Sequence, residues 1–242
     1  MKKIILGVSI ALAAVIAIAG IFVYRQYRFY TKDDPAKWEG EVTEIESWTG
    51  GSPLRGKAVV FIGSSSIKQW ESLRKDMAPL PVLNHGFGGS RIQDSTWYVP
   101  RLVTAYRPPM VVLYAGDNDI FFRDLLGKKP DTARRCLEDF KAFAAAVHRG
   151  RPEAKVYFVS IKPSPSRMKY WPQMREANRL IREYCAGDGR TAYIDVASAM
   201  LSGDGTPIQG YFLKDGLHLT GEGYRLWASI IKPALEKDYR WR

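Results

Sequence analysis

The stretch "AVVFIGSSS" (Ala58–Ser66) joins an apolar run to a glycine that is followed by three serines. A short run rich in β-branched residues is typical of a buried strand, and a Gly-Ser turn is typical of the step from a strand into a helix. The serines allow three interpretations: a helix cap, a phosphate-binding loop, or a nucleophile with partners elsewhere in the chain. The phosphate-binding loop is excluded, because the Gly-Lys-Ser/Thr spacing that it needs is missing.

Four more apolar runs follow in the 242-residue chain, with helical patterns between them. The predicted strands are 58–62, 81–84, 110–116, 154–161 and 191–196, and the predicted helices are 66–76, 91–106, 131–149, 172–186 and 220–237. Strands of this kind that alternate with helices predict a parallel sheet covered on both faces. Ligands of such sheets bind beyond the carboxyl ends of the strands. The residues that follow each strand are therefore the candidates for a functional site.

Four segments at this predicted edge carry chemistry when they are taken together. They are "GSSS" (63–66), "NHGFGGS" (84–90), "AGDND" (115–119) and "DGLHLTGEGY" (215–224). Each alone is weak evidence, because such segments are commonly caps or tight turns. Together they supply a serine nucleophile, oxyanion donors from a glycine loop and an asparagine amide, and an Asp-x-x-His pair. This set predicts an acyl-transfer site.

The chemistry explains the residue types. A serine hydroxyl is a poor nucleophile until a base takes its proton, and histidine is suited to that role. Asp215, three residues before His218, is placed to hold the other ring N–H and so fix the tautomer. Gly89 lets its backbone N–H approach a substrate oxygen with no side chain in the way.

These four blocks, in this order, resemble those of the SGNH (GDSL-type) hydrolases over about residues 57–232. The resemblance implies a flavodoxin-like three-layer α/β/α fold with a five-stranded parallel sheet, and a serine esterase that needs no metal or organic cofactor. It places the nucleophile on Ser65, and the orienting acid and the base on Asp215 and His218. It places the oxyanion donors on Gly89, on the Asn118 side chain and on the backbone N–H of Ser65.

One position departs from the family signature. Ser64 stands where the signature Gly-Asp-Ser has an aspartate that arranges the surrounding loops. We expect catalysis to survive this change, with Ser65 as the nucleophile. We expect Ser66 to cap the following helix and Ser64 to form hydrogen bonds within the loop.

The other histidines and the cysteines have simpler interpretations. His148 precedes a predicted helix end, where a structural role is expected. His85 lies in the glycine loop, where it either contacts substrate or, as we favour, serves the structure. Cys136 and Cys185 form no metal-ligand spacing with a histidine; two buried free thiols are favoured, and a disulfide between them stays open.

The N-terminus is expected to be a membrane segment. After two lysines, "IILGVSIALAAVIAIAGIFVY" (Ile4–Tyr24) runs without a charge and is long enough to cross a bilayer. We favour an uncleaved signal anchor over a cleaved signal peptide, with the domain outside the cytoplasm; secretion after cleavage is the alternative.

The expected organisation is an anchor at 1–24, a connector with a short amphipathic helix at 25–56 and the hydrolase domain at 57–242. In the connector, Trp38, Val42 and Ile45 have helical spacing, which favours docking on the domain over lying on the membrane.

The net charge of +11 favours anionic surfaces, but Lys and Arg are spread along the chain, so a solvated surface explains it more simply. No nucleic-acid-binding motif is present, and we expect no nucleic-acid partner. Residues 120–130 and 162–172 mix aromatic and basic residues after two of the strands. They fit either a lid over an acyl or headgroup pocket or ordinary packing with solvated charges.

The leading hypothesis is thus a membrane-tethered serine ester hydrolase that acts on a small-molecule, lipid or glycan ester. An O-acyltransferase acting on envelope glycans uses the same residues, so the sequence does not separate the two. A third hypothesis is a catalytically silent module that binds lipid or glycan. The natural substrate, the acyl chain length and the oligomeric state are not predicted.

Overall fold

The computed structural model describes residues 2–127 and 131–239, with side chains from residue 12 onward. The chain divides into two compact units, one up to Lys37 and one from Trp38 onward. Residues 38–56 of the expected connector therefore belong to the larger unit.

The first unit is dominated by one helix, α1 (Lys2–Thr31). Within it, Leu12–Thr31 is apolar and long enough to cross a membrane. A signal sequence near the N-terminus can have the same length and composition. The large apolar side chains from Leu12 to Phe29 are exposed in this unit. A long helix with exposed apolar side chains is typical of a membrane anchor or a signal sequence.

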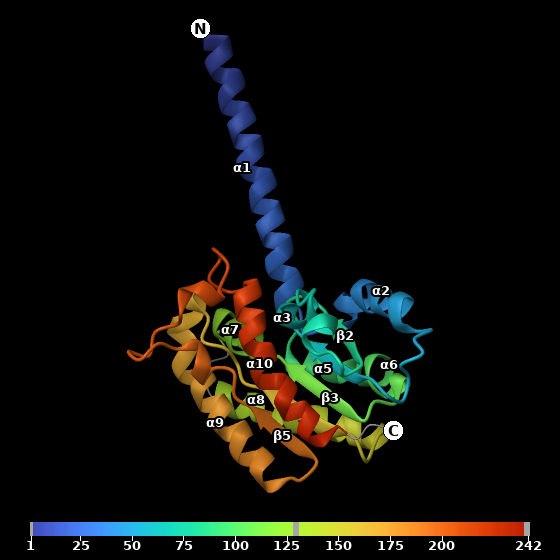
Figure 1. The fold of residues 1–242 in the computed structure, drawn as a ribbon. Helices are drawn as coiled ribbons and strands as arrows, with labels where there is room; N and C mark the ends of the chain where they lie inside the picture. The colour runs from blue at the N-terminus through green and yellow to red at the C-terminus, as the bar shows by residue number, and fades with distance from the viewer. Residues whose placement is uncertain (1, 128–130, 240–242) are drawn as a thin grey trace. The chain divides into compact units, whose positions relative to one another are not determined.

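The larger unit is built on a sheet of five parallel strands in the order β2-β1-β3-β4-β5 (Figure 1). The strands are β1 (Val59–Gly63), β2 (Val82–Gly86), β3 (Met110–Tyr114), β4 (Lys155–Val159) and β5 (Thr191–Ile194). Gly63, the last residue of β1, is in register with Gly86 of β2 and Tyr114 of β3. Three strands thus end at one level, and the predicted five-stranded parallel sheet with helices on both faces is confirmed.

Alternate residues of each strand point to opposite faces of the sheet. Tyr157 of β4 belongs to the core under α3 (Ser65–Lys68), α4 (Leu73–Asp76) and α10 (Gly221–Asp238). Its neighbour Phe158 packs on Phe140 of α8 (Thr132–Gly150), with ring centroids 5.1 Å apart. Helix α8 in turn contacts α5 (Ile92–Trp97) and α9 (Trp171–Gly187). The larger unit therefore has three layers.

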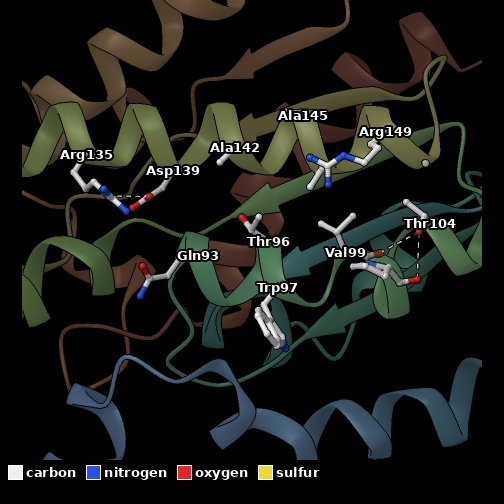
Figure 2. A pocket seen from close by; sticks show the side chains of 13 residues that line it. Gln93, Thr96, Trp97, Val99, Thr104, Arg135, Asp139, Ala142, Ala145 and Arg149 are labelled. Carbon is white, nitrogen blue, oxygen red and sulfur yellow. Dashed lines mark hydrogen bonds and ion pairs between the residues drawn. The ribbon is translucent and has the colours of Figure 1, made fainter.

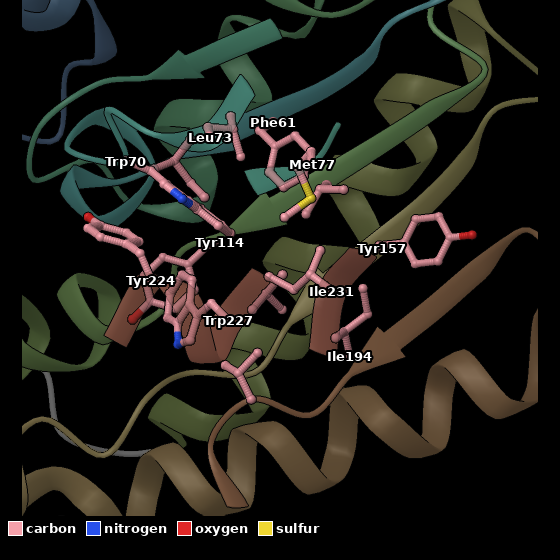
Figure 3. Close-up of a cluster of buried hydrophobic side chains, with 14 of the residues drawn as sticks. Phe61, Trp70, Leu73, Met77, Tyr114, Tyr157, Ile194, Tyr224, Trp227 and Ile231 are labelled. Carbon is pink, nitrogen blue, oxygen red and sulfur yellow. The ribbon is translucent and has the colours of Figure 1, made fainter. Parts of the chain in front are cut away.

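The core under α10 combines aliphatic side chains with several large aromatic ones (Figure 3). Trp70 stacks on Tyr224, with centroids 5.2 Å apart, and Trp227 lies 4.8 Å from the ring of Tyr114. All four side chains are buried. Helix α10 begins three residues after His218, so this packing also determines where that histidine loop meets the sheet.

Two helix predictions need correction. The predicted helix 66–76 is split into α3 and α4, with the buried Trp70 between them. The predicted helix 91–106 is split into α5, α6 (Val99–Leu102) and a 3₁₀ turn, η2 (Thr104–Tyr106), because Pro100 lacks the N–H that a continuous helix needs and instead occupies the first turn of α6. A further helix, α7 (Asp117–Leu125), was not predicted, and it includes part of the segment 120–130 that was considered as a lid. Residues 128–130 of that segment lie outside the described residues.

The expected amphipathic helix is present as α2 (Glu39–Thr49), preceded by the 3₁₀ turn η1 (Pro35–Trp38). Trp38, Val42 and Ile45 are buried in the larger unit. Trp38 packs against Phe87, directly after β2, with centroids 5.7 Å apart. The helix therefore docks on the domain, against the loop that was predicted to supply an oxyanion donor.

Candidate active site

The three serines lie in a sharp turn between β1 and α3. Gly63 has φ +141, and a Cβ there would come within 1.9 Å of the Tyr114 carbonyl oxygen, so only glycine fits. The Ser64 N–H donates to that same oxygen at 2.9 Å. Ser65 then opens helix α3 and is partly exposed, whereas Ser64 and Ser66 are buried. The turn therefore presents Ser65, alone of the three, to the surface.

The expected capping role of Ser66 is wrong. Ser64 occupies the N-cap position of α3, and its side chain makes no cap hydrogen bond. The Ser66 hydroxyl instead accepts a hydrogen bond from Lys162 Nζ at 3.0 Å. The turn is held by its backbone and by this buried lysine.

His218 bridges Ser65 and Asp215. Its Nε2 lies 3.1 Å from Ser65 Oγ, and its Nδ1 lies 2.6 Å from Asp215 Oδ2. The other oxygen of Asp215 accepts the backbone N–H groups of Leu217 and His218, at 2.8 and 3.0 Å. Burial opposes ionisation of Asp215, but the hydrogen bonds from His218 and these N–H groups outweigh it and lower the pKa of Asp215 to about 2. An ionised Asp215 accepts from Nδ1–H, which leaves Nε2 as the acceptor that faces Ser65.

The histidine loop is fastened at both ends. Leu213 N–H donates to the His218 carbonyl at 2.8 Å, and Phe212 pairs with Leu219 in an antiparallel bridge. After the loop, the Tyr224 hydroxyl donates to the Ser66 carbonyl at 3.0 Å. These bonds connect the segment that carries His218 to the helix that begins with Ser65.

The predicted oxyanion donors come from two neighbouring segments. Gly89 has φ +72, a conformation that favours glycine, in the loop after β2. Asn118 lies in the first turn of α7 after β3, and its Nδ2 donates to the Ser90 carbonyl at 3.1 Å. Phe87 N–H donates to the Gly63 carbonyl at 2.9 Å, which ties this loop to the serine turn. All five predicted site residues thus lie in segments at the carboxyl edge of the sheet.

A buried charged cluster lies beside these residues, and the sequence interpretation missed it. Lys162 is 1% exposed and donates to Ser66 Oγ, Tyr114 Oη and Asp117 Oδ2, at 3.0, 2.9 and 3.2 Å. Arg167, 7% exposed in the 3₁₀ turn η3 (Pro165–Tyr170), donates to Asn118 Oδ1 at 3.0 Å. Solvated charges, one expectation for residues 162–172, are therefore wrong for these two. The available signal was the position of both residues in the segment that follows strand β4.

The charge state of this cluster follows from Asp117. Burial favours the neutral forms and lowers the pKa of Lys162. Burial alone would raise the pKa of Asp117. The positive charges of Lys162 and Arg167 outweigh burial, so the pKa of Asp117 is lowered. The lowered pKa of Asp117 means that its carboxylate is ionised. Because two cations face this single carboxylate, we interpret the cluster as ionised.

The remaining histidines and the cysteines lie in structural positions. His85 is fully buried in β2, its Nδ1 lies 2.6 Å from the Leu102 carbonyl, and burial lowers its pKa to about 4. His148 lies near the end of α8, and its Nε2 is 3.0 Å from the carbonyl oxygen of Ala154, which follows the helix. Cys136 and Cys185 are both buried and free.

A separate groove of about 700 Å³ lies between α5–α6 and α8 (Figure 2). Trp97, Ala142 and Arg149 are among its lining residues, whereas Ser65 and His218 are not. The groove is therefore distinct from the candidate active site.

A serine, a histidine and an aspartate joined in this way after a parallel five-stranded sheet form the arrangement that serine hydrolases use. The chain belongs to the GDSL-like lipase/acylhydrolase family, whose model matches residues 51–226. The predicted family and enzyme class, a carboxylic ester hydrolase of the GDSL type, are confirmed.

Individual relatives agree with this assignment. An isoamyl acetate-hydrolyzing esterase 1 homolog from Bos taurus is 29% identical over 223 residues, which cover 79% of this chain and 86% of the relative. A structure described as an acylhydrolase from Bacteroides fragilis has a TM-score of 0.70 at 22% identity, over 86% of this chain and 100% of that one. A GDSL-like lipase from Bacteroides thetaiotaomicron has a TM-score of 0.67 at 21% identity, over 85% and 100%. At these identities the two structures establish the fold.

Proposed function

We propose that the protein is a membrane-tethered serine ester hydrolase that acts through an acyl-enzyme. The observation that carries the proposal is the position of His218, which contacts Ser65 Oγ through Nε2 and the ionised Asp215 through Nδ1. This is the contact pattern that a serine nucleophile needs for activation.

The reaction follows from these contacts. His218 Nε2 takes the proton of Ser65 as Oγ bonds to the ester carbonyl carbon, and the carbonyl oxygen becomes an oxyanion. The N–H groups of Ser65 and Gly89 and the amide of Asn118 stabilise that oxyanion. When the intermediate collapses, the ester C–O bond breaks and the leaving alcohol takes the proton from His218. Water then gives a proton to His218, attacks the acyl group and releases the acid, and Ser65 is reprotonated.

Tethering is supported by helix α1, whose apolar stretch Leu12–Thr31 meets the length and composition of a membrane span. We place the hydrolase domain outside the cytoplasm, because an N-terminal helix of this type also acts as an export signal. Fractionation of the full-length protein tests this: recovery with the membrane supports an anchor, and a shortened soluble product supports signal cleavage.

The substrate class is an ester with a small acyl group. The mammalian relative is named for the hydrolysis of isoamyl acetate, an acetyl ester, and this supports acetyl esters as the first compounds to test. A glycan hydroxyl in place of water would turn the same site into an O-acyltransferase. Product analysis in the presence of an oligosaccharide acceptor separates the two, because only a transferase moves the acetyl group to the sugar.

The decisive experiment is the turnover of p-nitrophenyl acetate by Ser65→Ala, with Ser198→Ala as the matched control on an exposed serine. The first variant is expected to lose roughly 10³-fold or more in kcat while it stays folded, and the control is expected to retain kcat. Equal turnover by Ser65→Ala and wild type would refute the esterase mechanism. Wild-type protein with no turnover of any acyl ester would favour the silent binding module.

A further inference from the structure

We infer that Arg167 is a positioning residue of the oxyanion hole, whose guanidinium holds the Asn118 amide so that an Nδ2 hydrogen faces the reacting carbonyl oxygen. The inference rests on the proposed function, in which Asn118 is an oxyanion donor. Arg167 lies in η3, outside the four sequence blocks that predicted the site.

The Asn118 amide is matched at both of its ends. Arg167 Nη2 donates to Oδ1 at 3.0 Å, and Nδ2 donates to the Ser90 carbonyl at 3.1 Å. A guanidinium carries only donors and a carbonyl carries only an acceptor, so both contacts are lost if the amide turns over. The amide is therefore held in one orientation. Nδ2 has two hydrogens, and since Ser90 takes one, the second is available to a substrate oxygen.

Arg167 is itself fixed by its surroundings. Its guanidinium carbon lies 4.6 Å from the centroid of the Phe121 ring, and Nη1 lies 3.6 Å from Asp117 Oδ2. Asp117 also accepts the backbone N–H of Asn118 through Oδ1, at 2.9 Å. The side chain is enclosed, so it acts on the reaction through Asn118 rather than by contact with substrate. A planar fork that stacks on a ring and donates sideways is a geometry that lysine does not reproduce.

The loss of this contact acts on the transition state. Without Arg167 only the Ser90 carbonyl restrains the amide, which can then turn its Oδ1 toward the substrate and place a partial negative charge where negative charge develops. The carbonyl oxygen of the ground-state ester carries a much smaller negative charge than the oxyanion, so substrate binding changes less than the stability of the transition state. The effect is therefore expected in kcat rather than in KM.

The test measures kcat and KM for p-nitrophenyl acetate with full-length protein in detergent, for wild type, Arg167→Met, Asn118→Ala and the double variant. Arg167→Met is expected to lower kcat about 10- to 100-fold and to change KM by less than about threefold. In the Asn118→Ala background the same substitution is expected to lower kcat by less than about threefold, because no amide is left to position. Arg167→Lys keeps one donor and is expected to recover part of the lost kcat.

Arg182→Met is the matched control. Its guanidinium also stacks on an aromatic ring, 4.8 Å from the Tyr193 centroid, and it pairs with Asp195 at 2.7 Å instead of with a site residue. Its kcat is expected to equal that of wild type. If circular dichroism shows that Arg167→Met is unfolded, Arg167→Lys in both backgrounds provides the same comparison.

Two results would overturn the inference: an unchanged kcat in Arg167→Met, or an equal loss with and without the Asn118 amide. The failure of the proposed function looks different, because the wild-type protein would then show no turnover of any acyl ester. Full activity in Asn118→Ala would remove Asn118 from the oxyanion hole, and the inference would fall with that assignment.

Discussion

Glu41 and Gly88, 47 residues apart, are joined by a hydrogen bond of 2.9 Å from the Gly88 N–H to Glu41 Oε2. The same oxygen accepts from Lys68 Nζ at 2.8 Å. Gly88 directly precedes Gly89, the proposed oxyanion donor. Glu41 lies in α2, before the segment that the family model matches. The docked connector helix thus supports the oxyanion loop through a residue that the family match does not include.

Glu41→Ala is therefore expected to lower kcat/KM for p-nitrophenyl acetate about fivefold, in line with the loss of one hydrogen bond worth about 1 kcal/mol. Glu41→Gln keeps an oxygen acceptor for Gly88 and is expected to stay within about twofold of wild type. Glu44→Ala, at an exposed position of the same helix, serves as the control. Equal kinetics for all four proteins would show that α2 does not support the loop.

Asp215→Asn is expected to lower kcat roughly 10²- to 10⁴-fold, because a neutral amide stabilises neither the His218 tautomer nor the imidazolium. Because hydrogen bonds lower the pKa of Asp215 to about 2, the wild-type carboxylate stays ionised throughout the range of about pH 5–9. The loss in the variant should therefore persist across that range in a pH–rate profile.

Asp204→Asn is the matched control for this substitution. Asp204 is also an exposed loop carboxylate whose pKa is lowered to about 2, by hydrogen bonds from Ser202 and Thr206. Its carboxylate accepts from Ser202 and Thr206 rather than from His218, so its variant should retain kcat. Recovery of Asp215→Asn activity at any pH would contradict the assigned role.

Asp119 links pH to stability. Burial, followed by the nearby Asp139, raises its pKa from 3.8 to about 8; Asp94 adds to the rise, while Arg91 and the Ile92 N–H oppose it. Between these two pKa values the folded protein holds a proton that the unfolded chain releases. The stabilising contribution is thus fully present below 3.8 and is lost as the pH rises through about 8.

Asp119→Asn mimics the protonated form and retains an oxygen acceptor for the Ile92 N–H. Its thermal midpoint is therefore expected to fall less than that of wild type between pH 5 and pH 9, a range chosen to span the pKa of about 8. Thermal melts of both proteins at the two pH values give the comparison. Parallel declines would show that Asp119 is not protonated in the fold.

The site could be predicted from the sequence to the extent that its residues follow strands. Ser65, Gly89 and Asn118 come after β1, β2 and β3, and parallel strands bring their carboxyl ends to one edge. Lys162 and Arg167 also follow a strand, but their burial depends on Asp117, a partner 45 residues or more away. A sequence shows a charge without showing what neutralises it.

Helix α7 was missed for a different reason. Its first turn contains Asp117 and Asp119, and segments of this composition are commonly tight turns. Carboxylates in a first helical turn also complement the positive end of the helix dipole, and they were an available signal for a helix that starts after Gly116. The local pattern supported both structures, and packing against η3 and α8 selected the helix.

Tyr224→Phe tests whether the contact between α10 and α3 aligns His218 with Ser65. The Tyr224 hydroxyl donates to the Ser66 carbonyl at 3.0 Å, and its loss leaves a buried carbonyl without that donor. The free energy of unfolding is expected to fall by about 1 kcal/mol, which lowers the thermal midpoint by about 2–4 °C, and kcat should fall about threefold.

Tyr239→Phe is the matched comparison for this prediction, because its hydroxyl donates to the Lys57 carbonyl at 2.8 Å beyond the far end of the same helix. It removes a bond of the same chemical type at a distance from His218, so it should lower stability without lowering kcat. Activity assays and thermal melts of both variants separate alignment from simple stabilisation. If both lower stability and neither lowers kcat, the Tyr224 contact stabilises the fold only, and the alignment of His218 rests on its own loop.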